Sequence, residues 1–511
     1  MRQYADGAWL HRNLFTTLPQ TGHQLNIFFL VLGKVSALTG LAPITVYHAC
    51  RVAAALLVPI LFWRLTGVLG LDALVRRCAL LVTAFGAGLG WLPGLYERGF
   101  GGPVDLWQPE ALTFLSLYLF PLFGVSMALM LLTWTHLIQA EQERSLRHAA
   151  WAGFWGFLLA NIHTYDIIPL SIVWLAFLSI SLFLARKSRM FQWPSLDRGA
   201  FPRLLVAGVP TAVSFGYMLW ILRTEKVFAL RVATETLTPG LHWVLLGFGL
   251  SIPLALWGIA AGIRPRRNAA AAPNAVLFLV LWAVLHIAAA YLPVPFQRKM
   301  LMGAQWPIGI LAGMGLAALL SRVPERRRAL VLTATVVLLS LTNIRFMLRD
   351  RGSVRYGGDI VRAFLLPGEH QALLWLRQNV PPGTPIQPLP WIAVSSEGRS
   401  AFADTTLACF APGVTGLPVH AGHWGETPEY GRTMGQWVRF LLPNTDDQWR
   451  RELLRESGVR YLVFSQKRPE TRDAAADAVL TAWLSSSGPP YLRKIPEASN
   501  EDADVYEVTE P

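Results

Sequence analysis

Apolar stretches long enough to cross a membrane recur along the first 350 residues, and they constrain the fold more than any other feature. About 20 apolar residues span the hydrocarbon core as a helix. The share of charged residues is 15%, well below the roughly 25% of a typical soluble protein. We therefore predict an α-helical multi-pass membrane bundle of about ten spans, near residues 43–63, 75–95, 111–137, 149–162, 167–185, 203–223, 240–263, 273–292, 303–320 and 329–348.

The excess of positive charge belongs to this apolar part. Up to Arg349 the chain has 29 Lys and Arg against 12 Asp and Glu, whereas from Asp350 onward the numbers are 16 and 20. Basic residues in the short loops of a membrane protein indicate topology, so we expect no nucleic-acid partner. Cys50, Cys78 and Cys409 are too scattered for a disulfide framework or a zinc site.

Alternate loops differ in their content of Lys and Arg, and this predicts the orientation. The basic loops hold Arg64, Arg76, Arg77, Arg144, Arg147, Arg186, Lys187, Arg189, Arg198, Arg203, Arg264, Arg266, Arg267, Arg322, Arg326, Arg327 and Arg328. The intervening loops hold only Arg98, Arg223, Lys226, Arg231, Arg298 and Lys299. By the positive-inside rule the first set is cytoplasmic. We expect a plasma-membrane or inner-membrane protein whose two terminal parts lie outside the cytoplasm.

Three regions follow from these boundaries: an outer first loop with an amphipathic helix (1–42), the transmembrane bundle (43–349) and an extracytoplasmic soluble α/β domain (350–511). In the third region, periodicity predicts helices over 370–379 and 446–456 and a buried strand over 458–464. The last dozen residues are rich in Glu and Asp, and we expect a frayed end there.

Polar residues near the outer ends of the spans are functional candidates, because such groups are costly at membrane depth. Asp6 is a candidate general base or metal ligand, or else a solvated turn residue. Glu110 either lines a cavity or only begins a helix. His163, Tyr165 and Asp166 fall where two apolar runs meet, so a His–Asp pair facing a substrate cavity competes with Asp166 as a helix cap.

Gln297, Arg298 and Lys299 precede the ninth span on the side where the other loops carry few cations. Topology therefore does not explain this pair of charges. Arg offers a planar fork of donors that suits a lipid phosphate. The alternative is that both side chains extend to lipid headgroups.

A loop in the C-terminal region concentrates histidine, tryptophan and acidic residues. His420, His423 and Glu426 are conceivable ligands of a metal, although the glycines and prolines between them argue against one helical face. The other interpretation is a structured loop that closes over the membrane cavity. His423 and Glu426 are then candidates for substrate binding.

Together these features resemble the GT-C class of polyprenyl-phosphate-sugar-dependent glycosyltransferases, including mannosyltransferase-like and arabinosyltransferase-like membrane proteins. The resemblance rests on the outer first segment, the many spans, the break at 161–166, the outer 297–299 segment and the external C-terminal domain. It implies a lipid-linked sugar held by its phosphate at the outer face. An external carboxylate would then deprotonate the acceptor hydroxyl for an inverting displacement, with a divalent metal as one further option.

The chain departs from that class at its start. Such enzymes usually begin with a cytoplasmic N-terminus and a first span before the acidic residue. This sequence begins inside what looks like the first outer loop. We expect the true start, with the missing span and the acid, upstream of Met1, and Asp6 is the substitute candidate.

The leading hypothesis is transfer of a sugar from a polyprenyl-phosphate carrier to an extracytoplasmic glycan, lipid or protein. A transporter or flippase of lipid-linked sugars would also use outer cations and a broken helix. Transporters commonly contain internal repeats, and no clear repeat is visible here. A third hypothesis is a non-catalytic protein of cell-envelope assembly. The sequence does not name the sugar, the acceptor or the linkage.

Overall fold

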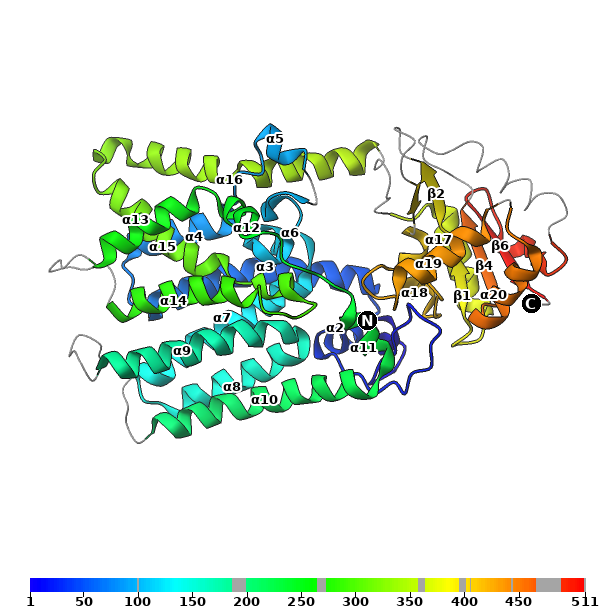
Figure 1. Ribbon diagram of the computed structural model, residues 1–511, viewed down its shortest axis with the longest axis horizontal. Helices are drawn as coiled ribbons and strands as arrows, with labels where there is room; N and C mark the ends of the chain where they lie inside the picture. Colours follow the sequence, from blue (N-terminus) through cyan, green and yellow to red (C-terminus); the bar gives the residue numbers. More distant parts are fainter. Residues whose placement is uncertain are drawn as a thin grey trace.

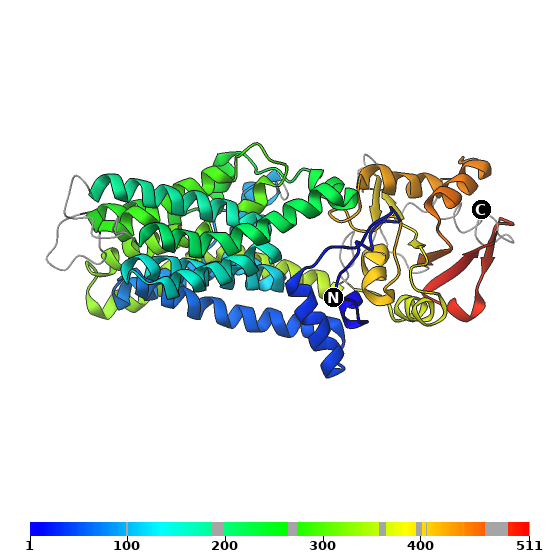
Figure 2. The same ribbon diagram turned by 90° about the horizontal axis from the view of Figure 1, so that it is seen from below.

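A computed structural model describes residues 1–98, 101–185, 199–263, 273–356, 364–394, 401–404, 406–442, 444–465 and 489–509. Long helices form one bundle, and the strands gather with further helices beside one end of it (Figure 1). The N-terminal segment lies between these two parts in both views (Figure 2). It contains α1 (Arg2–Ala5) and α2 (Ile27–Thr39), and the amphipathic character expected of a helix in this segment stays a prediction.

The bundle is built from α3 (Pro43–Val68), α4 (Ala73–Phe85), α6 (Thr113–Leu119), α7 (Pro121–Gln142), α8 (Leu146–Ile162), α9 (Ile167–Ala185), α10 (Ala200–Thr224), α12 (Leu241–Phe248), α13 (Ser251–Ile263), α14 (Pro273–Ala289), α15 (Gln305–Leu320) and α16 (Glu325–Tyr356). Among the described residues, six helices are long and apolar enough to cross a membrane, or seven if α12 and α13, bent by 78°, form one span. Each predicted range coincides with one or two helices, but the count of ten is not confirmed, because α4, α8 and α14 are short.

The second predicted span, 75–95, is wrong in its second half. Helix α4 ends at Phe85, and the chain leaves it as a loop in which Gly88 N and Gly90 N donate to Asp105 Oδ2 at 2.9 and 3.1 Å. A Cβ atom on Gly88 would lie 2.2 Å from the carbonyl oxygen of Leu246. The glycines therefore allow two backbones to approach closely, and the hydrophobicity of this stretch does not reveal that role.

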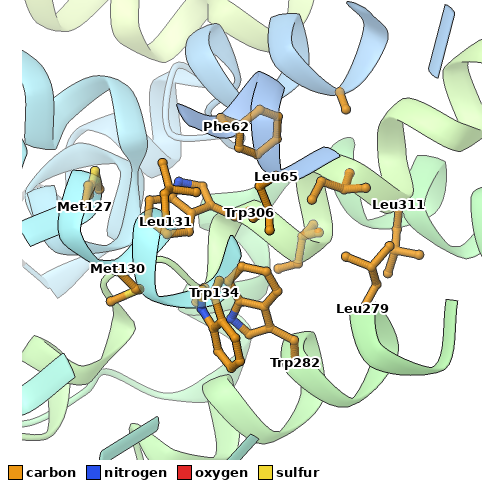
Figure 3. Close-up of a cluster of buried hydrophobic side chains, with 14 of the residues drawn as sticks. Phe62, Leu65, Met127, Met130, Leu131, Trp134, Leu279, Trp282, Trp306 and Leu311 are labelled. Carbon is orange, nitrogen blue, oxygen red and sulfur yellow. The ribbon is translucent and has the colours of Figure 1, made fainter. Parts of the chain in front are cut away.

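Aromatic side chains fill the centre of the bundle. Trp134, Trp282 and Trp306 are fully buried and lie together in the close-up of Figure 3. The ring centroids of Trp134 and Trp282 are 4.8 Å apart, and those of Trp282 and Trp306 are 6.1 Å apart. Such contacts between tilted or perpendicular rings are favourable. They join α7, α14 and α15 in the core of the bundle.

The C-terminal part, which we define as residues 364–509, contains a four-stranded sheet of order β1-β4-β6-β5. Its strands are β1 (Ile386–Pro388), β4 (Tyr461–Ser465), β5 (Leu492–Lys494) and β6 (Ala503–Val508); β1 and β4 are parallel and the other pairs antiparallel. Helices α17 (Pro367–Asn379) and α18 (Thr406–Thr415) cover one face, and α19 (Tyr430–Phe440) and α20 (Asp447–Ser457) cover the other. Strands β2 (Trp391–Val394) and β3 (Ala401–Asp404) form a separate pair.

The predicted helices over 370–379 and 446–456 are confirmed by α17 and α20, and the predicted strand by β4. Successive residues of β4 point to opposite faces, so Leu462 packs with α19 and α20 and Val463 with α17 and α18. Because both faces of β4 are buried, its sequence is a nearly continuous run of apolar residues.

The expectation of a frayed C-terminal end is wrong. Strand β6 lies between β4 and β5 and is buried along almost its whole length. The acidic residues that suggested fraying have partners, because Asp504 forms an ion pair with Lys494 at 2.7 Å and Asp502 accepts a hydrogen bond from Gly368 N at 2.8 Å. Lys494 lies on the neighbouring strand β5 and Gly368 lies in α17, so the composition of the segment itself does not show these partners.

The two ends of the bundle differ in character. Gln142 Nε2 donates to the carbonyl oxygen of Val68 at 3.1 Å, and Arg203 pairs with Glu141, so the turns after α3 and α7 and the start of α10 share one end. The turn between α15 and α16 lies at the same end, away from the C-terminal part (Figure 1). The basic loops that the structure describes therefore gather together; seven of the seventeen charges, within 186–198 and 264–272, lie outside the described residues.

Candidate active site

Three short 3₁₀ turns meet at the end of the bundle beside the C-terminal part. They are η3 (Pro109–Ala111), η4 (Thr164–Asp166) and η5 (Gln297–Leu301), and η5 contacts the other two. Gln108 Nε2 donates to the carbonyl oxygen of Arg298 at 3.0 Å, and Lys299 Nζ lies 4.6 Å from the ring centroid of Tyr165. Three of the sequence-predicted segments, separated by 50 residues or more, are thus brought together.

The N-terminal segment is hydrogen-bonded to the end of α8, next to the break between α8 and α9. The side chain of Asn161 accepts a hydrogen bond from Ile27 N at 2.7 Å and donates to the carbonyl oxygen of Leu25 at 3.1 Å. His163 ends α8 with a non-helical backbone, and η4 follows. These two bonds satisfy backbone groups of the N-terminal segment and fix that segment against the last turn of α8. The first segment and the break therefore stabilise each other.

His163 and Asp166 form a buried pair within this break. His163 Nδ1 lies 2.9 Å from Asp166 Oδ1, and the two side chains are 6% and 0% exposed. The rings of Phe123 and Tyr165 pack edge-on against the imidazole, with centroids 5.6 and 5.5 Å away. The contact is one of distance and not an aligned hydrogen bond, because within the described residues neither His163 Nδ1 nor Asp166 Oδ1 has a hydrogen-bond partner. A carboxylate beside Nδ1 stabilises a protonated imidazole and leaves Nε2 for another partner. The alternative of Asp166 as a simple helix cap does not explain the contact with His163.

Arg298 lies between two tryptophans from different parts of the chain. Its guanidinium carbon is 5.5 Å from the ring centroid of Trp107 and 5.6 Å from that of Trp424. The backbone is fixed as well, because Arg298 N donates to the carbonyl oxygen of Thr236 at 3.0 Å. Aromatic faces stabilise a cation. The arrangement fixes the planar fork of donors at the junction of the bundle and the C-terminal part.

Glu110 lies in η3, next to the turn that carries Arg298. Its side chain is only 7% exposed. Within the described residues, no hydrogen bond or ion pair reaches its carboxylate. A nearly buried acid without a protein partner is costly unless a ligand compensates it, so Glu110 stays a candidate for substrate binding.

Gln297 positions its own turn. Its Oε1 accepts from Thr238 N at 3.1 Å and its Nε2 donates to the carbonyl oxygen of Leu292 at 2.9 Å. Both ends of the amide are therefore engaged with backbone. The amide thus supports the turn that carries Arg298 and Lys299, and direct contact of Gln297 with substrate stays a prediction.

The loop that carries His423 and Glu426 is fastened to the bundle. Glu426 pairs with Arg231 of α11 (Lys226–Ala233) at 2.6 Å, and its carbonyl oxygen accepts from Asn13 Nδ2 at 2.7 Å. The His423 ring packs between Phe15 and Trp424, with centroid distances of 6.1 and 5.8 Å. Both residues thus hold the loop in place, and its closing over a membrane cavity stays a prediction.

The described residues contain no group of three or more His, Cys, Asp or Glu side chains placed to hold a metal ion. The conceivable site of His420, His423 and Glu426 is therefore not formed. His420 Nδ1 instead accepts from Trp437 Nε1 at 2.9 Å. Burial lowers the pKa of His420 to about 4 and also lowers the pKa of His423, so both rings are neutral near pH 7.

Asp6 lies apart from these groups. It follows α1 and pairs with Arg377 at 3.0 Å and with Arg2 at 3.7 Å. Among the described residues, no contact joins it to the three turns. The two guanidinium groups occupy the carboxylate, so the geometry gives Asp6 a role in attaching the N-terminal segment to the C-terminal part, and its catalytic role stays only a prediction.

Four residues with clear geometric roles were not assigned from the sequence: Trp107, Asn161, Arg231 and Trp424. Trp107 and Asn161 stand beside predicted candidates, so their neighbours were a usable signal. Arg231 and Trp424 act across long sequence separations. Trp424 follows the candidate His423 directly and so had the same local signal, whereas nothing local distinguishes Arg231 from an ordinary basic residue.

No protein-family model matches the sequence, and no curated protein matches it either. Solved structures do resemble the fold. Arabinofuranosyltransferase AftD from Mycobacteria is 17% identical with a TM-score of 0.59, over 100% of this chain and 37% of that chain. Oligosaccharyltransferase AglB from Archaeoglobus fulgidus, in complex with an inhibitory peptide and a dolichol-phosphate, is 12% identical with a TM-score of 0.52, over 100% and 69% of the two chains.

ArnT from Cupriavidus metallidurans is 13% identical with a TM-score of 0.50, over 99% of this chain and 90% of that chain. The chain thus spans little more than a third of AftD and most of ArnT. At these identities the likeness concerns the fold. The resemblance drawn from the sequence is confirmed at that level: the chain has the fold of the GT-C glycosyltransferases.

Proposed function

We propose that the protein transfers a sugar from a polyprenyl-phosphate carrier to an acceptor at the end of the bundle that faces the C-terminal part. One observation carries this proposal. Within a GT-C fold, a buried His163–Asp166 pair, an acid without a described partner and two cations from three separate segments lie on contacting turns. The pair supplies a base, and the cations supply a binding site for an anionic leaving group.

The donor phosphate is assigned to Arg298 and Lys299. A polyprenyl-phosphate sugar presents a charged phosphate at the membrane surface and an apolar chain within it. A guanidinium forms paired, charge-assisted hydrogen bonds to phosphate oxygens. The AglB structure with a dolichol-phosphate supports a lipid phosphate as the ligand of this fold. The identity of the sugar is left open.

His163 is proposed as the general base, and Asp166 as the residue that orients it. The acceptor hydroxyl oxygen bonds to the anomeric carbon while the bond from that carbon to the phosphate oxygen breaks. The polyprenyl phosphate leaves with the electron pair of that bond, and the hydroxyl proton passes to His163 Nε2. Asp166 is fully buried and engaged at His163 Nδ1, so it stabilises the resulting imidazolium.

The deciding experiment is a donor assay. Purified protein in lipid nanodiscs is incubated with a panel of polyprenyl-phosphate pentoses and hexoses, and release of the polyprenyl phosphate is measured. We expect turnover with at least one donor. Movement of an intact donor across a liposome membrane without turnover would instead establish the flippase hypothesis, and binding without either activity would favour an assembly protein.

Replacing Arg298 by alanine should weaken binding of undecaprenyl phosphate by about 1.5–3 kcal/mol, the range for a hydrogen bond to a charged group. Arg298→Lys should restore only part of the affinity, because an ammonium cannot form the planar fork. Arg322→Ala, at the opposite end of the bundle, is the matched control. An unchanged affinity in Arg298→Ala would mean that Arg298 contacts lipid headgroups and does not bind the carrier phosphate.

The orientation can be tested by cysteine labelling in intact cells. In a variant without Cys50, Cys78 and Cys409, a cysteine replacing the exposed Glu456 should react with a membrane-impermeant maleimide. A cysteine replacing the exposed Arg147 should react only after permeabilisation. The positive-inside rule gives this expectation. The opposite pattern would invert the proposed topology.

A further inference from the structure

A groove of about 440 Å³ opens beside the candidate site, on the side of the C-terminal part. Its lining residues are Thr234, Trp424, Glu429, Tyr430, Gly431 and Arg432. Thr234 directly follows α11, whereas the others belong to the loop before α19 and to its first turn. The groove shares Trp424 with the surroundings of Arg298. A ligand held there lies next to the place assigned to the donor phosphate.

We propose that this groove binds a saccharide, the acceptor of the transferred sugar, on an aromatic surface formed by Trp424 and Tyr430. The inference rests on the proposed function and names the class of its second substrate. Trp424 is 45% exposed, although its loop is fastened through Glu426 to Arg231. Arg298 and the His423 ring already contact this ring, so the part that stays open to solvent is what packs against the apolar face of a sugar ring.

The charges in the groove favour a neutral, hydroxyl-rich ligand. Glu429 stands at the N-terminus of α19, where its negative charge offsets the positive end of the helix dipole. Its carboxylate also meets Arg432 at 3.5 Å, and both side chains are exposed. Carboxylate and guanidinium groups side by side offer acceptors and donors for sugar hydroxyls without a net charge. An anionic ligand would be repelled by the Glu429 carboxylate.

The backbone at Glu429 supports a functional role for the groove. Its φ is 48° and its ψ is 44°, which is a left-handed conformation that non-glycine residues rarely adopt. Its side chain does not cap the helix. Strained conformations cluster at ligand-binding sites, where the surrounding structure maintains them. None of the six lining residues belongs to a strand, so the groove has no strand edge to pair with an extended peptide.

The test measures binding without a donor, in nanodiscs that contain the full chain. Arabinopentaose, mannopentaose and the peptide Ala-Asn-Ala-Thr-Ala are titrated by calorimetry. We expect one of the pentasaccharides to bind and the peptide not to bind. Tyr430→Ala should raise the Kd of the bound saccharide about tenfold or more, as expected for an aromatic residue at the centre of a binding site. Arg432→Ala, at an exposed position, is a second variant that does not threaten folding.

The control variant is Trp9→Ala, which removes another exposed tryptophan outside the groove and should leave the Kd unchanged. Undecaprenyl phosphate affinity is measured in parallel and should not change in Tyr430→Ala. Binding of the peptide in place of both saccharides would overturn the inference. So would a saccharide affinity unaffected by Tyr430→Ala and Arg432→Ala. Saccharide binding without turnover of any donor would refute the proposed function and leave the groove established.

Discussion

Replacing His163 by alanine is expected to lower the turnover number about 10²–10⁴-fold, the usual contribution of a positioned general base. The imidazole Nδ1 lies 2.9 Å from Asp166 Oδ1, and in the proposed mechanism its Nε2 takes the proton of the acceptor hydroxyl. Asp166→Asn should lower turnover as well, because an amide does not stabilise the imidazolium that forms. Undecaprenyl phosphate should bind both variants normally, since the phosphate is assigned to Arg298 and Lys299.

The measurement is donor turnover by purified variants, with donor affinity determined separately. His148→Ala is the matched control, because His148 lies at the opposite end of α8 from His163. There it contacts Glu143 and His136. Glu110→Gln is examined alongside, since this acid lies on the adjoining turn. If Glu110→Gln loses turnover and His163→Ala stays fully active, Glu110 of η3 is the general base. The His163–Asp166 pair then has only a structural role.

Replacing Arg203 by methionine is expected to destabilise the bundle by about 3–5 kcal/mol, the cost of leaving one charge of a buried pair without its partner. Arg203 makes two hydrogen bonds to Glu141, Nε to Oε1 at 3.1 Å and Nη2 to Oε2 at 2.8 Å. The side chains are 2% and 6% exposed. Such a loss is a large share of the roughly 5–15 kcal/mol that stabilises a typical protein.

The double variant Glu141→Leu with Arg203→Met separates the causes. With both charges removed, much of the stability should return, because well-packed apolar residues often replace a buried ion pair without loss. Unfolding by sodium dodecyl sulfate in mixed micelles, followed by tryptophan fluorescence, compares the variants. If the double variant is as unstable as Arg203→Met, packing and not the unpaired charge explains the loss. Arg147→Met, at an exposed position of the same end, is the control.

The sequence by itself determined the features that depend on neighbours along the chain. Apolar length located the helices of the bundle, and the apolar run ending at Phe464 located β4. The polar residues between α8 and α9 located a functional candidate, because a break in an apolar helix leaves backbone groups that need partners. These features are local, so hydropathy and periodicity carry them. The same local signals erred at Phe85, where α4 ends early because the following backbone packs against a distant one.

The tertiary structure decided which of the candidate polar residues lie on contacting turns. It joined Glu110, His163 and Arg298 on contacting turns and placed Asp6 in an ion pair with Arg377. It also made β6 a central strand, although its composition is acidic. Each of these outcomes depends on a partner far away in the sequence. The packing of helices and strands decides which distant residues become neighbours. The composition and periodicity of a single segment therefore cannot predict such a pair.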